Sequence, residues 1–333
     1  MSDSARKRNI GGFIRVFLND KVAISFLMVI ALFIVGEIVV PGFVSFSHVM
    51  AVLQAAFFLG LLGLGQTIVV LSGKEGLDLS VGSTMTVGVL LGAAVIQGSD
   101  ANLLIAVAIV VVCGFALGVV NGVGISYLEI APLIMTLTWG IVIEGALLII
   151  TRGHYPGKAS PLLEELGHGS LSLTVDGALL QVPWVVIIWI VLIILVSFVL
   201  RRTSVGFVLY GVGANDRAAE LLGIKARRVR IFAYGMSGML SALAGMLLLG
   251  YVQNPDIALS ARYVLLSVIA VIVGGISFGG GAGSYLGAVA GSIFLQTLLS
   301  ILVTLKMGDG IRQMITGMVL LLLLFAYTRR VRR

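Results

Sequence analysis

The sequence is poor in charged residues, which make up 11% of its 333 positions, whereas a water-soluble domain carries about 25%. Proline is scarce, at 6 residues, and the single cysteine, Cys113, lies in an apolar run and forms no intrachain disulfide. Glycine is abundant, at 43 residues, and membrane helices use glycine to approach one another closely. These features predict a packed bundle of membrane-spanning helices.

Patterns that would carry catalysis or bind a cofactor are also missing. No GxxxxGK[ST] phosphate loop occurs, and the glycine-rich run 274–283 lacks the lysine that such a loop requires. The three histidines, His48, His154 and His168, do not have the spacing of metal ligands. We therefore expect no catalytic residue, no cofactor, no metal ligand and no nucleic-acid partner on this chain.

Ten apolar stretches are long enough, or nearly so, to cross a bilayer, which takes about 20 residues each. They lie at about residues 22–40, 55–72, 79–97, 102–120, 131–150, 183–200, 231–250, 263–278, 284–305 and 313–328. The first run is too long for the core of a signal peptide and has no small-residue cleavage pattern, so we interpret it as a retained anchor. The sequence predicts an all-α, polytopic membrane protein with about ten transmembrane helices.

Basic residues predict the orientation of these helices, because lysine and arginine accumulate on the cytoplasmic side. Of the 22 basic residues, five lie in the arm 1–21, seven in the loop 201–230 and four in the tail 329–333. Ten crossings place these three clusters on one side, with both termini cytoplasmic. The predicted organisation is therefore a cytoplasmic arm (1–21), a transmembrane domain (22–328) and a basic cytoplasmic tail (329–333).

Two long loops connect the predicted spans. The loop 151–182 is expected outside, either as a connector with a small hairpin or helix, or as a lip that receives a delivery protein. The cytoplasmic loop 201–230 contains an alanine-rich stretch that Asp216 can cap and Gly223 can end as a short helix. The charge asymmetry that sets the orientation requires the arginines of this loop, but it does not require a helix between them. We interpret the helix as a docking element for another protein.

Glycine interrupts the apolar pattern once in each half, in segments 71–83 and 274–287. Discontinuous membrane helices in matching positions of two inverted-repeat halves mark transport pathways, although ordinary tight turns have the same composition. Glu144 lies in the middle of a predicted span, where an ionisable group has a functional role by default. Polar residues at similar depth suit a hydroxyl-rich solute beside aromatic rings, and they equally suit bridges between helices. The candidate pathway residues are Phe57, Gln66, Asp78, Ser80, Asn121, Thr136, Trp139, Glu144, Ser277 and Gln296.

Four motifs in order resemble those of the ribose/galactose-type permeases of ABC importers, from about residue 50 to the C-terminus. They are Leu64-Gly-Gln-Thr67 with Leu77-Asp-Leu-Ser-Val-Gly-Ser83, Val120-Asn-Gly122 with Pro132-Leu-Ile-Met-Thr-Leu137, Gly213-Ala-Asn-x-x-Ala-Ala-x-x-x-Gly-Ile224, and Gly274-Gly-Ile-Ser-x-x-Gly-Gly-x-Gly283. The third motif matches the coupling region of that family. The resemblance implies that eight residues of this motif couple the chain to an ATPase. They are Asn215, Asp216, Ala218, Ala219, Glu220, Leu221, Gly223 and Ile224.

The resemblance also implies partners. These are an ABC ATPase subunit with two fused nucleotide-binding domains, a periplasmic or lipid-anchored solute-binding protein, and a second permease subunit that is identical or different. The location implied is the bacterial cytoplasmic (inner) membrane, and the solute is a sugar or a sugar-like molecule such as autoinducer-2. The chain itself would be a non-catalytic translocation subunit.

The sequence departs from the family pattern at a few positions. Lys74 and Glu75 are extra residues in the first glycine segment, Thr138 stands where glycine is usual, and Glu144 where arginine is frequent. The reversed charge at Glu144 puts the ligand in doubt. Our hypothesis is that Glu144 alters solute preference or pairs with a neighbouring subunit.

Three other functions fit parts of the pattern. An ion-coupled secondary transporter of small polar solutes would use Asp78 or Glu144 as its coupling acid, but it has no use for a docking helix. An integral membrane enzyme would need catalytic side chains clustered near one interface. A branched-chain amino-acid permease shares distant ancestry, and the Leu-Asp-Leu-Ser-Val-Gly motif favours the sugar importers instead.

Overall fold

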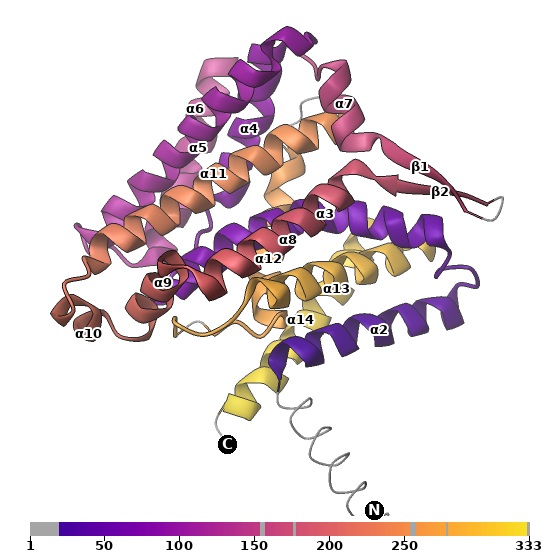
Figure 1. Ribbon diagram of the computed structural model, residues 1–333. Coiled ribbons are helices and arrows are strands. Elements are labelled where there is room, and N and C mark those ends of the chain that lie inside the picture. Colours follow the sequence, from indigo (N-terminus) through magenta and orange to yellow (C-terminus); the bar gives the residue numbers. More distant parts are fainter. Residues whose placement is uncertain (1–19, 154–156, 176–177, 254–257, 278, 332–333) are drawn as a thin grey trace, which may run out of the picture.

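The computed structural model describes residues 20–153, 157–175, 178–253, 258–277 and 279–331, and it is predominantly helical (Figure 1). Residues 1–19 of the predicted arm, residues 332 and 333 of the predicted tail, and His154 lie outside the described residues. The elements are α2 (Lys21–Val39), α3 (Phe46–Leu71), α4 (Val81–Ile96), η1 (Asp100–Asn102), α5 (Leu103–Ser126), α6 (Pro132–Thr151), α7 (Pro161–His168), β1 (Ser170–Val175), β2 (Ala178–Pro183), α8 (Trp184–Arg202), α9 (Ser204–Ala214), α10 (Asp216–Leu221), α11 (Ala226–Val252), α12 (Ala258–Val273), α13 (Tyr285–Thr304) and α14 (Asp309–Val331).

Each of the ten predicted apolar runs forms a helix. Within the described part of the chain, 7 stretches are long and apolar enough to cross a membrane: α2, α3, η1 with α5, α6, α8, α11 and α13. The runs at 79–97 and 263–278 form α4 and α12, which have only 16 residues each. The last run forms α14. The structure is therefore consistent with a polytopic α-helical membrane protein, with 7 candidate spans among the described residues.

The predicted loop 151–182 contains α7 and an antiparallel hairpin of β1 and β2, so the chain is not purely α-helical. The side chain of Ser160 caps α7, and Pro161 occupies its first turn, where the fixed φ of proline suits a helix start. In β1, leucine alternates with serine or threonine, the period of a strand with one apolar face. Figure 1 shows this hairpin projecting from one end of the bundle, while α10 lies at the other end of α11.

Helix α11 occupies the centre of the bundle and packs against α3, α4 and α5. Glycine makes these contacts close enough for backbone to meet backbone. A Cβ on Gly245 would overlap the Met85 carbonyl oxygen in α4, and a Cβ on Gly118 in α5 would overlap the carbonyl oxygen of Tyr234. Such close approach is how membrane helices gain contact area when lipid supplies no hydrophobic drive.

The two glycine-interrupted segments lie side by side. The first connects α3 to α4 and the second connects α12 to α13. Gly280 is in contact with Gly73, and the amide of Gly281 donates to the Leu71 carbonyl oxygen over 3.3 Å. Gly213, at the end of α9, packs against both Leu71 and Gly281. These breaks therefore meet directly beside the start of α10.

Adding one methyl group at Gly245 should destabilise the protein. We expect Gly245→Ala to lower the free energy of unfolding by about 1–3 kcal/mol, because α11 and α4 must separate to admit the Cβ. Thermal unfolding of the purified protein in detergent measures the change. The matched control is Gly211→Ala in α9, where no atom lies within 4 Å of a Cβ. Equal stability of both variants would contradict the role of close α11–α4 packing.

Candidate functional site

Side chains from three helices hold the break between α3 and α4. The Gln66 amide in α3 pairs with both backbone groups of Asp78, at 2.6 Å to the carbonyl oxygen and 3.2 Å from the amide nitrogen. The Thr136 hydroxyl in α6 accepts from the Leu79 amide over 3.0 Å. The Tyr234 hydroxyl in α11 lies 3.3 Å from the backbone nitrogen and oxygen of Leu77. Together these bonds replace the intrahelical partners that residues 77–79 lack.

The Asp78 carboxylate is completely buried at the centre of this arrangement. It accepts hydrogen bonds from the Ser80 amide at 3.0 Å, from the Ser80 hydroxyl at 2.6 Å and from the Ser237 hydroxyl at 2.7 Å. Asn121 of α5 donates to the Ser80 hydroxyl over 2.7 Å, and its own carbonyl oxygen is buried without a partner. None of the ion pairs among the described residues includes Asp78. Hydroxyl and amide groups alone therefore satisfy this carboxylate.

Five of the ten candidate pathway residues come together in this network, which we call the Asp78 network. They are Gln66, Asp78, Ser80, Asn121 and Thr136, and Tyr234, Ser237 and Ser267 also belong to it. Sequence reasoning missed Tyr234 and Ser237. Their separation of three residues places both on one face of α11, but only the fold shows that this face meets the break.

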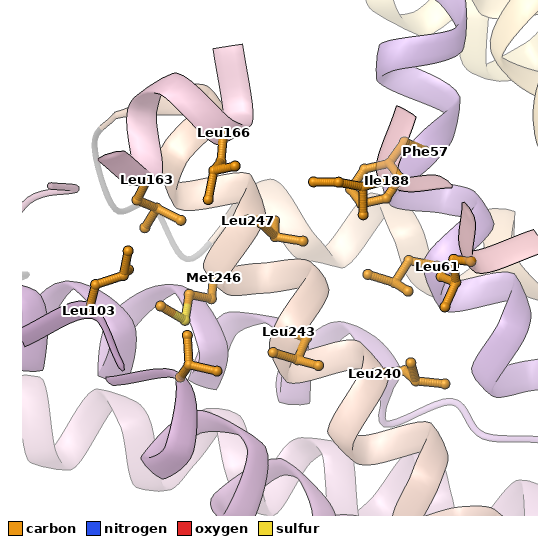
Figure 2. A pocket seen from close by; sticks show the side chains of 12 residues that line it. Phe57, Leu61, Leu103, Leu163, Leu166, Ile188, Leu240, Leu243, Met246 and Leu247 are labelled. Atoms are coloured by element: carbon orange, nitrogen blue, oxygen red, sulfur yellow. The ribbon is translucent and has the colours of Figure 1, made fainter. Parts of the chain in front are cut away.

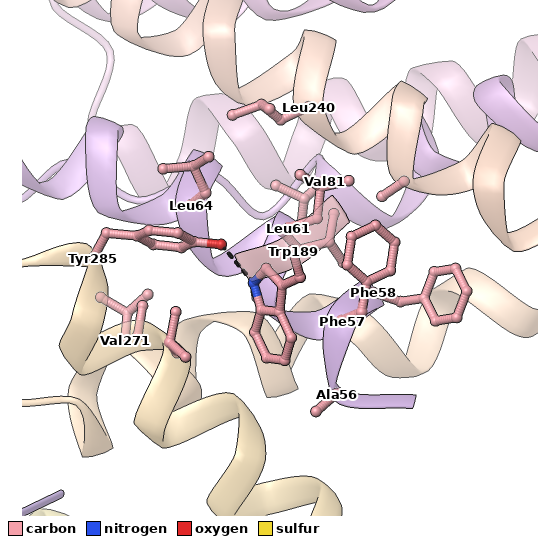
Figure 3. Close-up of a cluster of buried hydrophobic side chains, with 14 of the residues drawn as sticks. Ala56, Phe57, Phe58, Leu61, Leu64, Val81, Trp189, Leu240, Val271 and Tyr285 are labelled. Carbon is pink, nitrogen blue, oxygen red and sulfur yellow. Dashed lines mark hydrogen bonds between the residues drawn. The ribbon is translucent and has the colours of Figure 1, made fainter. Parts of the chain in front are cut away.

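The two aromatic candidates, Phe57 and Trp139, lie outside this network and contact neighbouring helices. Phe57 is fully buried and its ring packs edge-on against Phe58 and Trp189. Figure 3 shows Trp189 donating to the Tyr285 hydroxyl over 2.9 Å, and that hydroxyl donates to the Gly60 carbonyl oxygen. Trp139 is partly buried and donates to the Leu117 carbonyl oxygen over 3.1 Å. These bonds join α8 to α13 and α3, and α6 to α5.

Phe57 also lines a cavity of about 260 Å³ between α3, α5, α7, α8 and α11. Figure 2 shows only carbon and sulfur in the side chains around it, including Leu61, Leu240 and Met246. A sugar requires hydrogen-bonding partners in its site. This apolar cavity therefore does not have the composition of a sugar site.

Glu144, Ser277 and Gln296 lie apart from the Asp78 network. Glu144 is on the exposed face of α6, next to exposed Ile141 and Leu148, and no described residue pairs with it. Ser277 lies in the second glycine segment, where its carbonyl oxygen accepts from the Gly280 amide over 3.1 Å. Gln296 is partly buried in α13. No grouping of three or more His, Cys, Asp or Glu side chains around one point occurs within the described residues.

The predicted helix in the loop 201–230 forms as α10, but Asp216 does not cap it. Asn215 has the extended backbone of a cap residue, and its side-chain oxygen accepts from the Ala218 amide over 3.0 Å. Asp216 is instead in the first turn and binds Arg230 of α11 through both carboxylate oxygens, at 2.6 and 2.8 Å. Gly223 ends the helix with a φ of +82°.

The outer surface of α10 carries large apolar side chains. Leu221 and Leu222 are 85% and 77% exposed, and Glu220 and Arg217 beside them are also exposed. Ala219 points the other way and is buried against Val212 and Ala226. Ala219, one of the predicted coupling residues, therefore packs α10 against the rest of the protein and does not face outward.

Comparison with known proteins relates this chain to transport permeases. A sequence model described as the permease component of a branched-chain amino acid transport system matches residues 48–326. The autoinducer 2 import system permease protein LsrC of Salmonella typhimurium is 30% identical over 91% of this chain and 84% of its own. The chain belongs to the sugar ABC-importer permease family.

Other relatives in this family are similar over nearly their whole length. The fructose import permease protein FruF of Bifidobacterium longum is 27% identical, with 92% of this chain and 86% of that protein aligned. The ribose import permease protein RbsC of Escherichia coli is also 27% identical, with 92% of both chains aligned. No solved structure matches. For this permease, the resemblance inferred from the motifs is confirmed.

Thr136→Val tests the contribution of the Asp78 network to stability. The substitution leaves the Leu79 amide buried without its acceptor, so we expect the free energy of unfolding to fall by about 1–3 kcal/mol. Thr138→Val on the same helix is the matched control, because Thr138 is exposed. Thermal unfolding in detergent compares the two variants. A smaller loss for Thr136→Val than for Thr138→Val would show that the bond to Leu79 does not matter.

Proposed function

We propose that this permease translocates a sugar or a sugar-like small polar solute across the bacterial inner membrane. Ten helices, α2 to α6, α8 and α11 to α14, cross the bilayer, with both termini in the cytoplasm and the two halves in inverted orientation. Alternating access around the central helices moves the solute. ATP hydrolysis on a separate subunit drives it, and this chain performs no covalent chemistry.

The exposed leucines of α10 carry this proposal. Leu221 and Leu222 stand in a basic loop where no apolar span requires them, and Arg217 and Lys225 flank them. An exposed apolar pair with a charged rim is the composition of a protein contact. A secondary transporter has no second subunit to dock there. An ATPase with two fused nucleotide-binding domains is the partner that fits this surface.

The opposite end of the bundle suits the delivery protein. Helix α7 and the β1–β2 hairpin stand together there, and Leu179 on the hairpin is 63% exposed. Their separation from α10 by the length of α11 supports binding of the two partners on opposite sides of the membrane. A periplasmic or lipid-anchored solute-binding protein would release its sugar at this end. Named importers of ribose, fructose and autoinducer 2 among the relatives support this class of solute.

A second permease subunit, identical or different, completes the assembly and covers Glu144. A carboxylate at the middle of a membrane-spanning helix costs about 2.5–3.5 kcal/mol when it faces lipid. Among the described residues Glu144 has no partner, and its face of α6 is exposed. A neighbouring protein surface would supply the hydrogen-bond donor that lipid lacks.

Leu221→Glu should separate this permease from its ATPase. We expect the variant to insert normally but to retain at least about tenfold less ATPase during purification, since a charge replaces a docked apolar side chain. The rate of ATP hydrolysis stimulated by the solute-binding protein should fall together with ATPase retention. Leu179→Glu on the hairpin is the control for ATPase retention, because its side chain is also exposed but lies at the other end of the bundle.

Uptake by cells expressing the complete system distinguishes the rival transporter. Labelled ribose, fructose and galactose are suitable probes. Under our proposal uptake survives an uncoupler while ATP is sustained. Uptake that stops with the uncoupler, together with normal ATPase retention by Leu221→Glu, would favour an ion-coupled carrier.

Glu144→Gln tests the subunit contact. We expect about tenfold weaker retention of the second permease subunit, because the substitution removes the charge-assisted part of the contact. Co-purification of the two permease subunits with different tags measures retention. Glu129→Gln is the control, since Glu129 is exposed in the α5–α6 connection outside the spans. Unchanged assembly and unchanged uptake would show that Glu144 has neither a subunit role nor a solute role.

A further inference from the structure

One face of α11 carries three buried polar side chains in succession. Arg230, Tyr234 and Ser237 are spaced i, i+4 and i+7, so they stack along one side of the helix. Arg230 is 1% exposed, and Tyr234 and Ser237 are completely buried. Burial of such groups is unfavourable unless each has a partner. The partners of these three groups belong to two different parts of the molecule.

The outer member of this column is bound to α10. Arg230 contacts both carboxylate oxygens of Asp216 through one nitrogen, Nη2, at 2.6 and 2.8 Å. Asp216 remains partly accessible, with its side chain 30% exposed, while Arg230 is sequestered. Removing one partner from such a pair leaves an uncompensated buried charge. A displacement of α10 must therefore move α11 or break this pair.

The inner members of the column are bound to the break between α3 and α4. Tyr234 bonds the backbone of Leu77, and Ser237 donates to the Asp78 carboxylate over 2.7 Å. Between Arg230 and Ser237 the helix rises about 10 Å, at 1.5 Å per residue. Because α11 is continuous here, its two sets of contacts are rigidly connected.

A second contact joins the same two regions by backbone alone. Gly213 lies just before α10 and packs against Leu71 and Gly73 at the beginning of the break, and against Gly281 of the second glycine segment. The break 72–80 is therefore held from both sides by elements that flank α10. By contrast, the pair of Arg227 and Glu129 at the same end of α11 is 3.7 Å long and its side chains are 52% and 72% exposed. Exposed pairs of this kind contribute little.

We propose that Asp216, Arg230, Tyr234 and Ser237 form a relay that makes the conformation of the break 72–80 depend on the position of α10. They are positioning residues, and the element they control is the backbone of the break, which carries Asp78. The relay rests on the proposed function only for the origin of the displacement, namely a docked ATPase. The coupling itself is a property of this chain.

Hydrogen–deuterium exchange of the full-length permease in lipid nanodiscs, without partners, tests the relay. Asp216→Asn weakens the outer contact, and we expect about tenfold faster exchange of the backbone amides of residues 77–80, although the Asp216 carboxylate binds Arg230 and not that segment. Coupling between two sites is reciprocal. Ser237→Ala and Tyr234→Phe should therefore increase exchange in α10 (Asp216–Leu221) as well.

Glu129→Gln is the matched control, because it breaks the exposed pair with Arg227 and should leave the break unchanged. Tyr234→Phe removes a single hydroxyl, so it reports on the relay even if Asp216→Asn fails to fold. The double variant Asp216→Asn/Ser237→Ala should exchange about as fast at the break as the faster single variant, because both substitutions act on one path. Effects confined to each mutated site, or effects that multiply, would overturn the relay. The effect of Leu221→Glu on ATPase docking tests only the proposed function, and the exchange experiment tests only the relay. Failure of one proposal can therefore be distinguished from failure of the other.

Discussion

The backbone of residues 77–79, in the break between α3 and α4, must find hydrogen-bond partners inside the protein, because the lipid of a membrane supplies none. Leu77, Asp78 and Leu79 lie outside any helix and receive partners from Tyr234, Gln66 and Thr136. Three separate helices must therefore keep their positions relative to this short segment. Gln66 and Thr136, two of the polar residues predicted as pathway candidates, serve this requirement, which explains why they are buried beside the break.

Glycine packing and this polar network support each other. Close approach of α11 to α4 and α5 at Gly245 and Gly118 brings Tyr234 and Ser237 within hydrogen-bond distance of the break. The same approach excludes lipid and water, which strengthens the hydrogen bonds to Asp78. The centre of the bundle is thus held by short polar bonds, whereas α6 and α8 around it expose large apolar side chains.

Composition and periodicity were sufficient to locate all ten helical runs and the short helix before α11, because apolar length and glycine position are local properties. Contacts between distant segments were not accessible in this way. The sequence favoured Asp216 as a helix cap, but Arg230, 14 positions later, recruits its carboxylate and leaves the cap to Asn215. Glu144 looked like an interior pathway residue, and the structure puts it on the exposed face of α6, since a run apolar on all sides does not reveal which face is buried.

The two extra residues of the first glycine segment show how the site tolerates a departure from the family pattern. Lys74 and Glu75 are exposed and both have a φ of +53°, a conformation that costs a non-glycine residue about 1–2 kcal/mol. The added length is taken up in this exposed turn, and Gly76 returns the chain to the interior. Asp78 lies in register with Gln66 and Ser237, so this turn forms the surface while the network beneath it is intact.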